Sequence, residues 1–324
     1  MADEPVEDAA QEREEEESLA RIEAGGIPIA AERRLRELRG TGGENGGRGV
    51  SFTSDLSVSG FALCHQLGLE PLSQVMGSSI YQMGYQSAWG QMQGGYNPAG
   101  GAMIELDTLS QALNEVRERA LHRLAEEAHQ IGADAVVGVE TRAGESELGG
   151  GGGQLALEHM VLGTAVRRKG ARGEQPVMTE LSVADYALLL RAGIEPAGIV
   201  AWSSVFFSSY AYRGMLGGPG GGAGMMSSMQ PYELSEFTQA LYNARERTMG
   251  QINRQAAALG AAGVVGVRIG HTIRPHTLSS GMGGGFGASE LRGMMVTFNA
   301  VGTAIRQHAG AEIQAPKPVV DLFA

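Results

Sequence analysis

The chain has 324 residues, of which 43% are hydrophobic and 50 are glycine, and its formal net charge at pH 7 is −11. This length corresponds to about two domains, and the hydrophobic fraction excludes a disordered chain. The single cysteine, Cys64, excludes an intramolecular disulfide and an all-cysteine zinc site, so a reducing, cytoplasmic location is expected.

Acidic residues are concentrated at the N-terminus, where residues 1–18 hold nine of them against one arginine. Blocks of like charge usually stay solvated, so we expect a mostly disordered acidic tail. Without this segment the chain is nearly neutral, which disfavours nucleic acid as a partner. The longest apolar stretch, residues 198–207, is shorter than the about 20 residues of a membrane-spanning helix, so no transmembrane segment is expected.

Residues 27–38 combine apolar residues at helical spacing with charged neighbours, which predicts a short amphipathic helix. A glycine-rich hinge follows at residues 40–49. We therefore assign residues 1–49 to an N-terminal part that contains the tail, this helix and the hinge.

The rest of the chain is a tandem repeat. Residues 55–71 recur at 180–196, and residues 105–142 recur at 233–270 with 15 of 38 positions identical. The first copy closes with the sequence GTAVR and the second with GTAIR. The predicted boundaries are 50–172 for the first unit, 173–310 for the second unit and 311–324 for a C-terminal tail.

Both units predict the same elements in the same order, which makes the fold α+β. A short helix begins after a serine N-cap, Ser57 or Ser182. It is followed by a strand, a glycine-rich loop, a long helix with one apolar stripe, and two further strands. Because one long helix cannot protect the edges of so small a sheet, we expect each unit to need neighbours.

The sequences RERA (117–120), HQIGADAVVGV (129–139) and GTAV (163–166), each echoed in the second unit, resemble the YbjQ-like family, which is often labelled a heavy-metal-binding domain. The resemblance covers both units. It implies dodecin-subunit-like β-α-β-β units, here each with an extra N-terminal short helix, that assemble into pentameric rings without established enzymatic activity. The second unit departs from the pattern at Ala262, where the first has Asp134.

Metal ligands are sparse. Glu118, His122, Glu126 and His129 share one face of the long helix, but the second copy has no ligand set at the matching positions. A solvated or intersubunit face is therefore favoured, and His122, Glu126 and His129 remain weak metal candidates. Cys64 falls at an apolar periodic position and is expected in the core. The methionines of the second insertion, which could bind Cu(I), are better suited to adaptable contacts: Met215, Met225, Met226 and Met229.

The sequence predicts no catalytic residue and no cofactor. Neither lysine follows a glycine, which excludes a P-loop, and no GxSxG motif is present. The glycines at 283–287 precede a predicted strand, whereas a dinucleotide site needs a helix there.

Polar residues retained in both units are expected to serve contacts between subunits. Arg-Glu-Arg on one helical turn suits ion pairs across such a contact. The predicted interface residues are Arg117, Glu118 and Arg119 in the first unit and Arg245, Glu246 and Arg247 in the second.

We therefore expect a non-enzymatic, ring-forming assembly protein whose loops or acidic tail bind an unidentified protein partner. The alternative is a metal- or small-ligand-binding protein that uses pockets between units. A homopentamer, with a mass of about 170 kDa for five chains of 33.9 kDa, is expected. Since two kinds of unit cannot alternate around a ring of five units, each ring would hold one kind.

Overall fold

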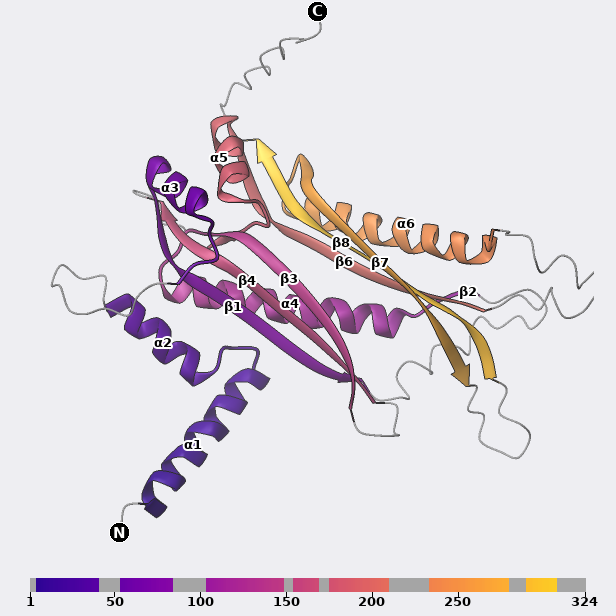
Figure 1. Cartoon of the computed structure of the whole chain (residues 1–324), viewed down its shortest axis with the longest axis horizontal. Helices are drawn as coiled ribbons and strands as arrows, with labels where there is room; N and C mark the ends of the chain where they lie inside the picture. The colour runs from indigo at the N-terminus through magenta and orange to yellow at the C-terminus, as the bar shows by residue number, and fades with distance from the viewer. Residues whose placement is uncertain are drawn as a thin grey trace, which may run out of the picture.

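The computed structural model describes residues 4–40, 53–83, 103–148, 154–168, 175–209, 233–279 and 290–307, which form six helices and eight strands (Figure 1). The helices are α1 (Glu4–Glu23), α2 (Ile29–Gly40), α3 (Val58–Leu67), α4 (Asp107–Gln130), α5 (Val183–Arg191) and α6 (Ser235–Ala258). The strands are β1 (Leu69–Met83), β2 (Met103–Glu105), β3 (Ala135–Leu148), β4 (Gln154–Arg168), β5 (Val177–Met178), β6 (Ile194–Ser209), β7 (Gly263–Ser279) and β8 (Glu290–Gln307).

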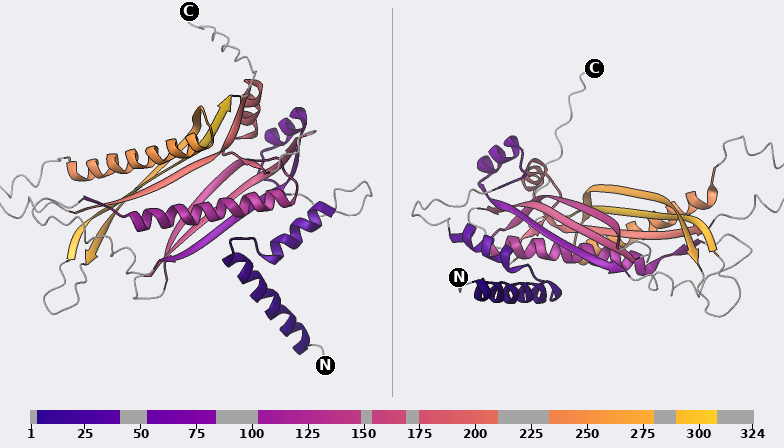
Figure 2. Two further views of the ribbon diagram at one scale, coloured as in Figure 1. Left: turned by 180° about the vertical axis from the view of Figure 1, so that it is seen from behind. Right: turned by 60° about the horizontal axis from the view of Figure 1, so that its bottom comes forward.

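The strands form two four-stranded sheets, ordered β1-β4-β3-β5 and β2-β6-β8-β7. Helix α4 packs on β1 and β4 of the first sheet, and α6 packs on β6 and β8 of the second (Figure 2). The two sheets have a register shift at the same place. In β1 it lies beside Pro71, and in β6 it lies beside Pro196. The α+β class and the predicted order of elements in each unit are thus observed.

The short helices begin as the serines predict. Ser57 accepts a hydrogen bond from the backbone N–H of Gly60, and Ser182 accepts one from Asp185. Gly68 and Gly193, which follow these helices, have φ of 67° and 71°, the left-handed conformation that glycine adopts without strain.

The N-terminal segment differs from the prediction. Residues 4–23 form the regular helix α1, which extends away from both sheets (Figure 1), so the expectation of a mostly disordered tail is wrong there. Glutamate is a good helix former, and two ion pairs join α1 to the neighbouring helix α2. Arg33 of α2 pairs with Glu14 of α1, and Arg21 of α1 pairs with Glu32 of α2. The amphipathic helix predicted at 27–38 is α2, and residues 41–49 of the predicted hinge lie outside the described ranges.

Gly77 of β1 lets α4 approach the first sheet closely. A Cβ atom at this position would lie 1.9 Å from the carbonyl oxygen of Ala120 and 2.7 Å from the backbone nitrogen of Leu124. The apolar stripe of α4 is buried against the sheet at this crossing, with Ala120 and Leu124 fully inaccessible.

The two units exchange strands. β2 precedes α4 in the first unit but pairs antiparallel with β6 in the second sheet. β5 leads into the second unit but pairs parallel with β3 in the first sheet. No helix within the described ranges is both long enough and apolar enough to span a membrane.

Candidate functional site

The contact between the two units is built on the free edge of β6. The first-unit strand β2 pairs with β6 from Met103↔Ser208 to Glu105↔Phe206. The first turns of α4 continue the cover, since the N–H of Leu106 donates to the carbonyl of Val205 (2.8 Å). Ser110 Oγ accepts from the N–H of Val205 (2.9 Å). An open edge strand invites association with other chains, and here the first unit closes it.

Asn114 of α4 covers the next residue of the β6 edge, Ser203. Its side chain accepts from the Ser203 N–H (2.8 Å) and donates to the Ser203 carbonyl (2.9 Å), as a partner strand would. One turn further, the guanidinium of Arg117 donates to Asn114 Oδ1 (2.8 Å) and to the hydroxyl of Ser203. Three side chains from two units thus form one buried network.

Arg117 is buried, and within the described residues no carboxylate forms an ion pair with it. Burial lowers the pKa of Arg117 to about 10, so it remains a cation at neutral pH. Arg117, predicted as an interface residue, does lie at a contact between units, but within one chain. Its role in contacts between chains stays a prediction.

The other predicted interface residues are more exposed. Arg119 pairs with Glu115 at 3.4 Å and lies over the ring of Tyr81, with 5.2 Å between guanidinium carbon and ring centroid. Arg247 of α6 reaches Glu105 of β2 at 2.9 Å, which joins the two units a second time. The remaining three are exposed: Glu118, Arg245 and Glu246.

A cavity of about 930 Å³ lies between the two units beside this network. Its walls come from α4, from β3 and β4 of the first sheet, and from β6, β7 and β8 of the second. They include Arg117, His159, Ser203, Arg268 and Arg274. Within the described structure His159 Nε2 is buried and has no hydrogen-bond partner. Burial, together with the charge of Arg117, lowers the pKa of His159 to about 3, so this imidazole is neutral at physiological pH.

Sequence reasoning did not find Asn114 or His159. Neither residue is polar in both copies, because the second copy has Tyr242 and Phe298 at these positions. A difference between the copies could have identified them, namely a polar residue in one copy where the other copy has an aromatic side chain.

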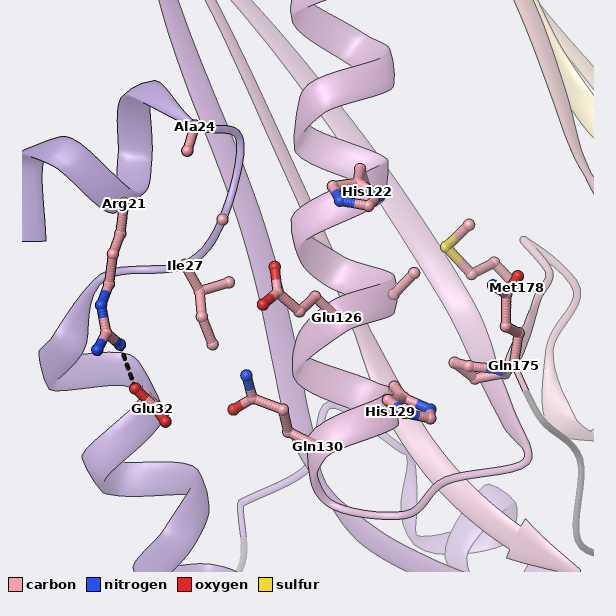
Figure 3. Close-up of a pocket in the computed structure, with 13 residues that line it drawn as sticks. Arg21, Ala24, Ile27, Glu32, His122, Glu126, His129, Gln130, Gln175 and Met178 are labelled. Carbon is pink, nitrogen blue, oxygen red and sulfur yellow. Dashed lines mark hydrogen bonds and ion pairs between the residues drawn. The ribbon is translucent and has the colours of Figure 1, made fainter.

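A second cavity, of about 680 Å³, lies on the face of α4 that carries the predicted metal candidates (Figure 3). His122, Glu126 and His129 line one side along successive turns of α4, and the ion pair of Arg21 with Glu32 lies on the other side. Both histidines are exposed. Among the residues that the structure describes, no group of three or more His, Cys, Asp or Glu side chains is placed to hold a metal ion.

Comparison with known proteins supports the resemblance drawn from the repeat. Residues 74–169, which run from β1 through β4, match the YbjQ family, whose description reads "Putative heavy-metal-binding". The chain is also 33% identical over 283 residues to "Encapsulin nanocompartment protein Rv1762c" of Mycobacterium tuberculosis, an alignment that covers 84% of this chain and 92% of the relative. Residues 74–169 thus carry a YbjQ-like domain. The chain as a whole belongs to the same family as this mycobacterial relative.

Within the part of the chain that the structure describes, the single thiol is not placed to bind a soft metal. Cys64 is fully buried in an apolar cluster with Leu69 and Val137, as predicted, and burial raises the pKa of its thiol. A thiol held neutral in such a cluster is a poor ligand, because metals bind the thiolate. The methionines predicted to make adaptable contacts lie outside the described residues: Met215, Met225, Met226 and Met229.

Proposed function

We propose that this YbjQ-like chain is a non-enzymatic, self-assembling protein of a protein nanocompartment. The observation that carries the proposal is the contact between the units, where β2 and Asn114 complete the hydrogen bonding of the β6 edge. In this contact one unit supplies hydrogen-bond partners to the edge strand of a related unit, and edge strands also join separate chains in this way. The name of the mycobacterial relative supports the nanocompartment.

In this proposal the chain has two dodecin-subunit-like units, at 50–172 and 173–310, and five chains form the assembly in the cytoplasm. The glycine-rich loops or the acidic N-terminal segment bind a further protein. The fully buried state of Cys64, the single cysteine, is compatible with a reducing compartment.

The serines retained in both copies support a structural rather than a catalytic role. Ser203 is buried, its hydroxyl accepts from Arg117, and its backbone is held by Asn114. A nucleophilic serine needs a base within hydrogen-bond reach. His159, which lines the same cavity, has no hydrogen bond from Nε2 to any described residue.

Size-exclusion chromatography coupled to light scattering tests the proposal on the full chain, and negative-stain electron microscopy shows the form of the particle. We expect a closed particle with a mass that is a multiple of 33.9 kDa, near 170 kDa for five chains. A mass of one chain at micromolar concentration contradicts self-assembly.

A second candidate function rests on the cavity between the units. The orphaned Nε2 of His159 and the guanidinium of Arg117 both border a space of about 930 Å³, which is large enough for a small molecule. The ligand would offer a hydrogen bond to the imidazole and negative charge to the arginine. Native mass spectrometry of the purified assembly checks this candidate, since a ligand adds a fixed mass per chain that His159→Phe removes. Elemental analysis of the same sample detects a metal instead.

A further inference from the structure

The contact between the two units is heterologous: each unit contributes a different surface to it. Arg117 of α4 reaches Ser203 of β6, but the repeat counterparts of these residues, Arg245 and Ser78, do not meet. Arg245 pairs with its neighbour Glu246, and the carbonyl of Ser78 accepts a hydrogen bond from Arg123 of its own unit. A contact of this head-to-tail kind leaves one unused surface at each end, and repeating it generates a ring or a filament.

The unused receiving surface is the outer face of β1. Met76, Ser78 and Ile80 correspond to Ala201, Ser203 and Val205 of β6, 125 positions later. Val205 is 0% exposed because α4 covers it, whereas Ile80 is 68% exposed. Met76 and Ser78 are exposed as well.

The outer face of β1 borders a groove that has room for a helix end. The groove measures about 430 Å³ and lies between β1 and the turn that joins α1 to α2. Ile27, Met76 and Ile80 give it an apolar wall. Charged side chains line it as well: Glu23, Arg119, Arg123 and Glu127.

The unused inserting surface is the start of α6. Leu234 and Tyr242 correspond to Leu106 and Asn114, 128 positions earlier. Leu234 is 43% exposed against 4% for Leu106, and Tyr242 is 59% exposed against 4% for Asn114. Thr238, between them, supplies a hydroxyl where Ser110 supplies one to Val205.

The second unit has Tyr242 where the first has Asn114, and this difference fits the hydrogen bonds that β1 already makes. Asn114 satisfies both the N–H and the carbonyl of Ser203. At Ser78 the carbonyl already accepts from Arg123, so a single acceptor such as the Tyr242 hydroxyl suffices for the N–H.

A second pair of surfaces leads to the same arrangement. β5 pairs with β3 at Ala135 and Val136, and the N–H of Gly138 donates to the carbonyl of Leu181. The counterpart of β3 is β7, which forms the outer edge of the second sheet. The counterparts of residues 178–181 are residues 53–56, of which Thr53 and Asp55 are exposed.

We propose that the partner at these surfaces is a second copy of this chain: α6 and β7 of one copy dock on β1 and residues 53–56 of the next, and so repeat the contact inside the chain. This inference rests on the proposed self-assembly and names the surfaces that carry it. The two kinds of unit then alternate around the assembly, so five chains give ten units in one ring. This differs from the separate rings of one kind of unit that the sequence led us to expect.

Two single substitutions, Ile80→Arg and Tyr242→Arg, each place a charge on one exposed surface of the full chain. We expect each variant alone to run at the mass of one chain by light scattering. An equimolar mixture is expected to run at two chains, because one intact pair of surfaces remains and the blocked pair carries like charges. The matched control is Leu19→Arg, at an equally exposed leucine of α1, which is expected to keep the wild-type mass.

The outcomes separate this inference from the proposed function. A wild-type mass of one chain overturns self-assembly itself. Three outcomes overturn only the docking surfaces while self-assembly stands. Either charge variant keeps the wild-type mass, Leu19→Arg also dissociates the oligomer, or the mixture of the two charge variants yields no two-chain species. If a charge variant fails to fold, as judged by its thermal melt, oxidation of mixed Ile80→Cys and Thr238→Cys chains replaces it. A disulfide-linked two-chain band is expected, and its absence overturns the proposal.

Discussion

Arg117 on α4 donates a hydrogen bond to the hydroxyl of Ser203 on β6, across 86 positions of the chain and from one unit to the other. Both residues have counterparts in the other copy, Arg245 and Ser78, which lie exposed and apart. The same residue types therefore have different surroundings in the two units, and stability measurements can compare them.

Arg117→Ala is expected to lower the free energy of unfolding by about 2–4 kcal/mol, because it removes two buried hydrogen bonds, leaves Asn114 and Ser203 underpartnered and opens a cavity. Chemical denaturation at fixed chain concentration measures the change. The control, Arg142→Ala, removes an exposed arginine paired with Glu140 at 3.3 Å and is expected to change stability by less than about 0.5 kcal/mol. Equal effects of the two substitutions would show that the buried network adds nothing.

Gly77→Ala is expected to destabilise the chain by about 3 kcal/mol, because the added methyl would overlap the backbone of α4 at Ala120. Gly250→Ala on α6 is the matched control, since a Cβ there meets no atom within 4 Å. Alanine favours the helix over glycine, so Gly250→Ala is expected to stabilise by about 0.5–1 kcal/mol. Opposite shifts in melting temperature are the expected result, and a neutral Gly77→Ala would contradict the close approach of α4.

The buried imidazole of His159 is expected to make folding pH-dependent. Its pKa is lowered from 6.5 to about 3 in the folded chain, so below pH 6.5 the unfolded state binds a proton that the folded state does not. The stability that His159 contributes is therefore fully present above pH 6.5 and is lost as pH falls toward 3, at up to about 1.4 kcal/mol per pH unit.

His159→Phe, which installs the residue of the second copy, isolates this effect from the carboxylates. The difference in unfolding free energy between the variant and the wild-type chain is expected to shift in favour of the variant as pH falls from 6.5 to 4. A difference that stays constant over this range would mean that His159 titrates normally in the folded chain.

Glu127→Gln is expected to preserve the sheet but loosen α2. Glu127 accepts a hydrogen bond from the N–H of Met76 (2.9 Å), and its counterpart Gln255 accepts one from Ala201 at the same distance, so an amide can hold the edge of β1. Glu127 also pairs with Arg34 of α2 at 2.9 Å, and this ion pair is lost. Hydrogen exchange is expected to rise in α2 and stay unchanged in β1. Glu37→Gln, at an exposed position of α2, is the control and should leave both unchanged.

Much of the fold follows from local pattern. The apolar stripes of α4 and α6, the serine caps and the repeat itself predict the elements of each unit in their observed order. The charge pattern of residues 1–18 alone does not predict helix α1, because it leaves out Arg33 of α2, which pairs with Glu14 of α1. Retained residues predict only part of the site, namely Arg117. Asn114 and His159 matter where one unit meets the other, and the two units occupy different positions in that contact.

The strand exchange between the units also bears on where the chain can be cut. β5 comes after the boundary at 172/173 yet completes the first sheet, and β2 comes before it yet covers β6. A gene fragment that ends at residue 172 would encode a first unit without its fourth strand, and a fragment that starts at 173 would leave the edge of β6 bare. The chain thus has two sequence repeats, but each repeat contributes a strand to the sheet of the other, so neither repeat contains all the strands of its own sheet.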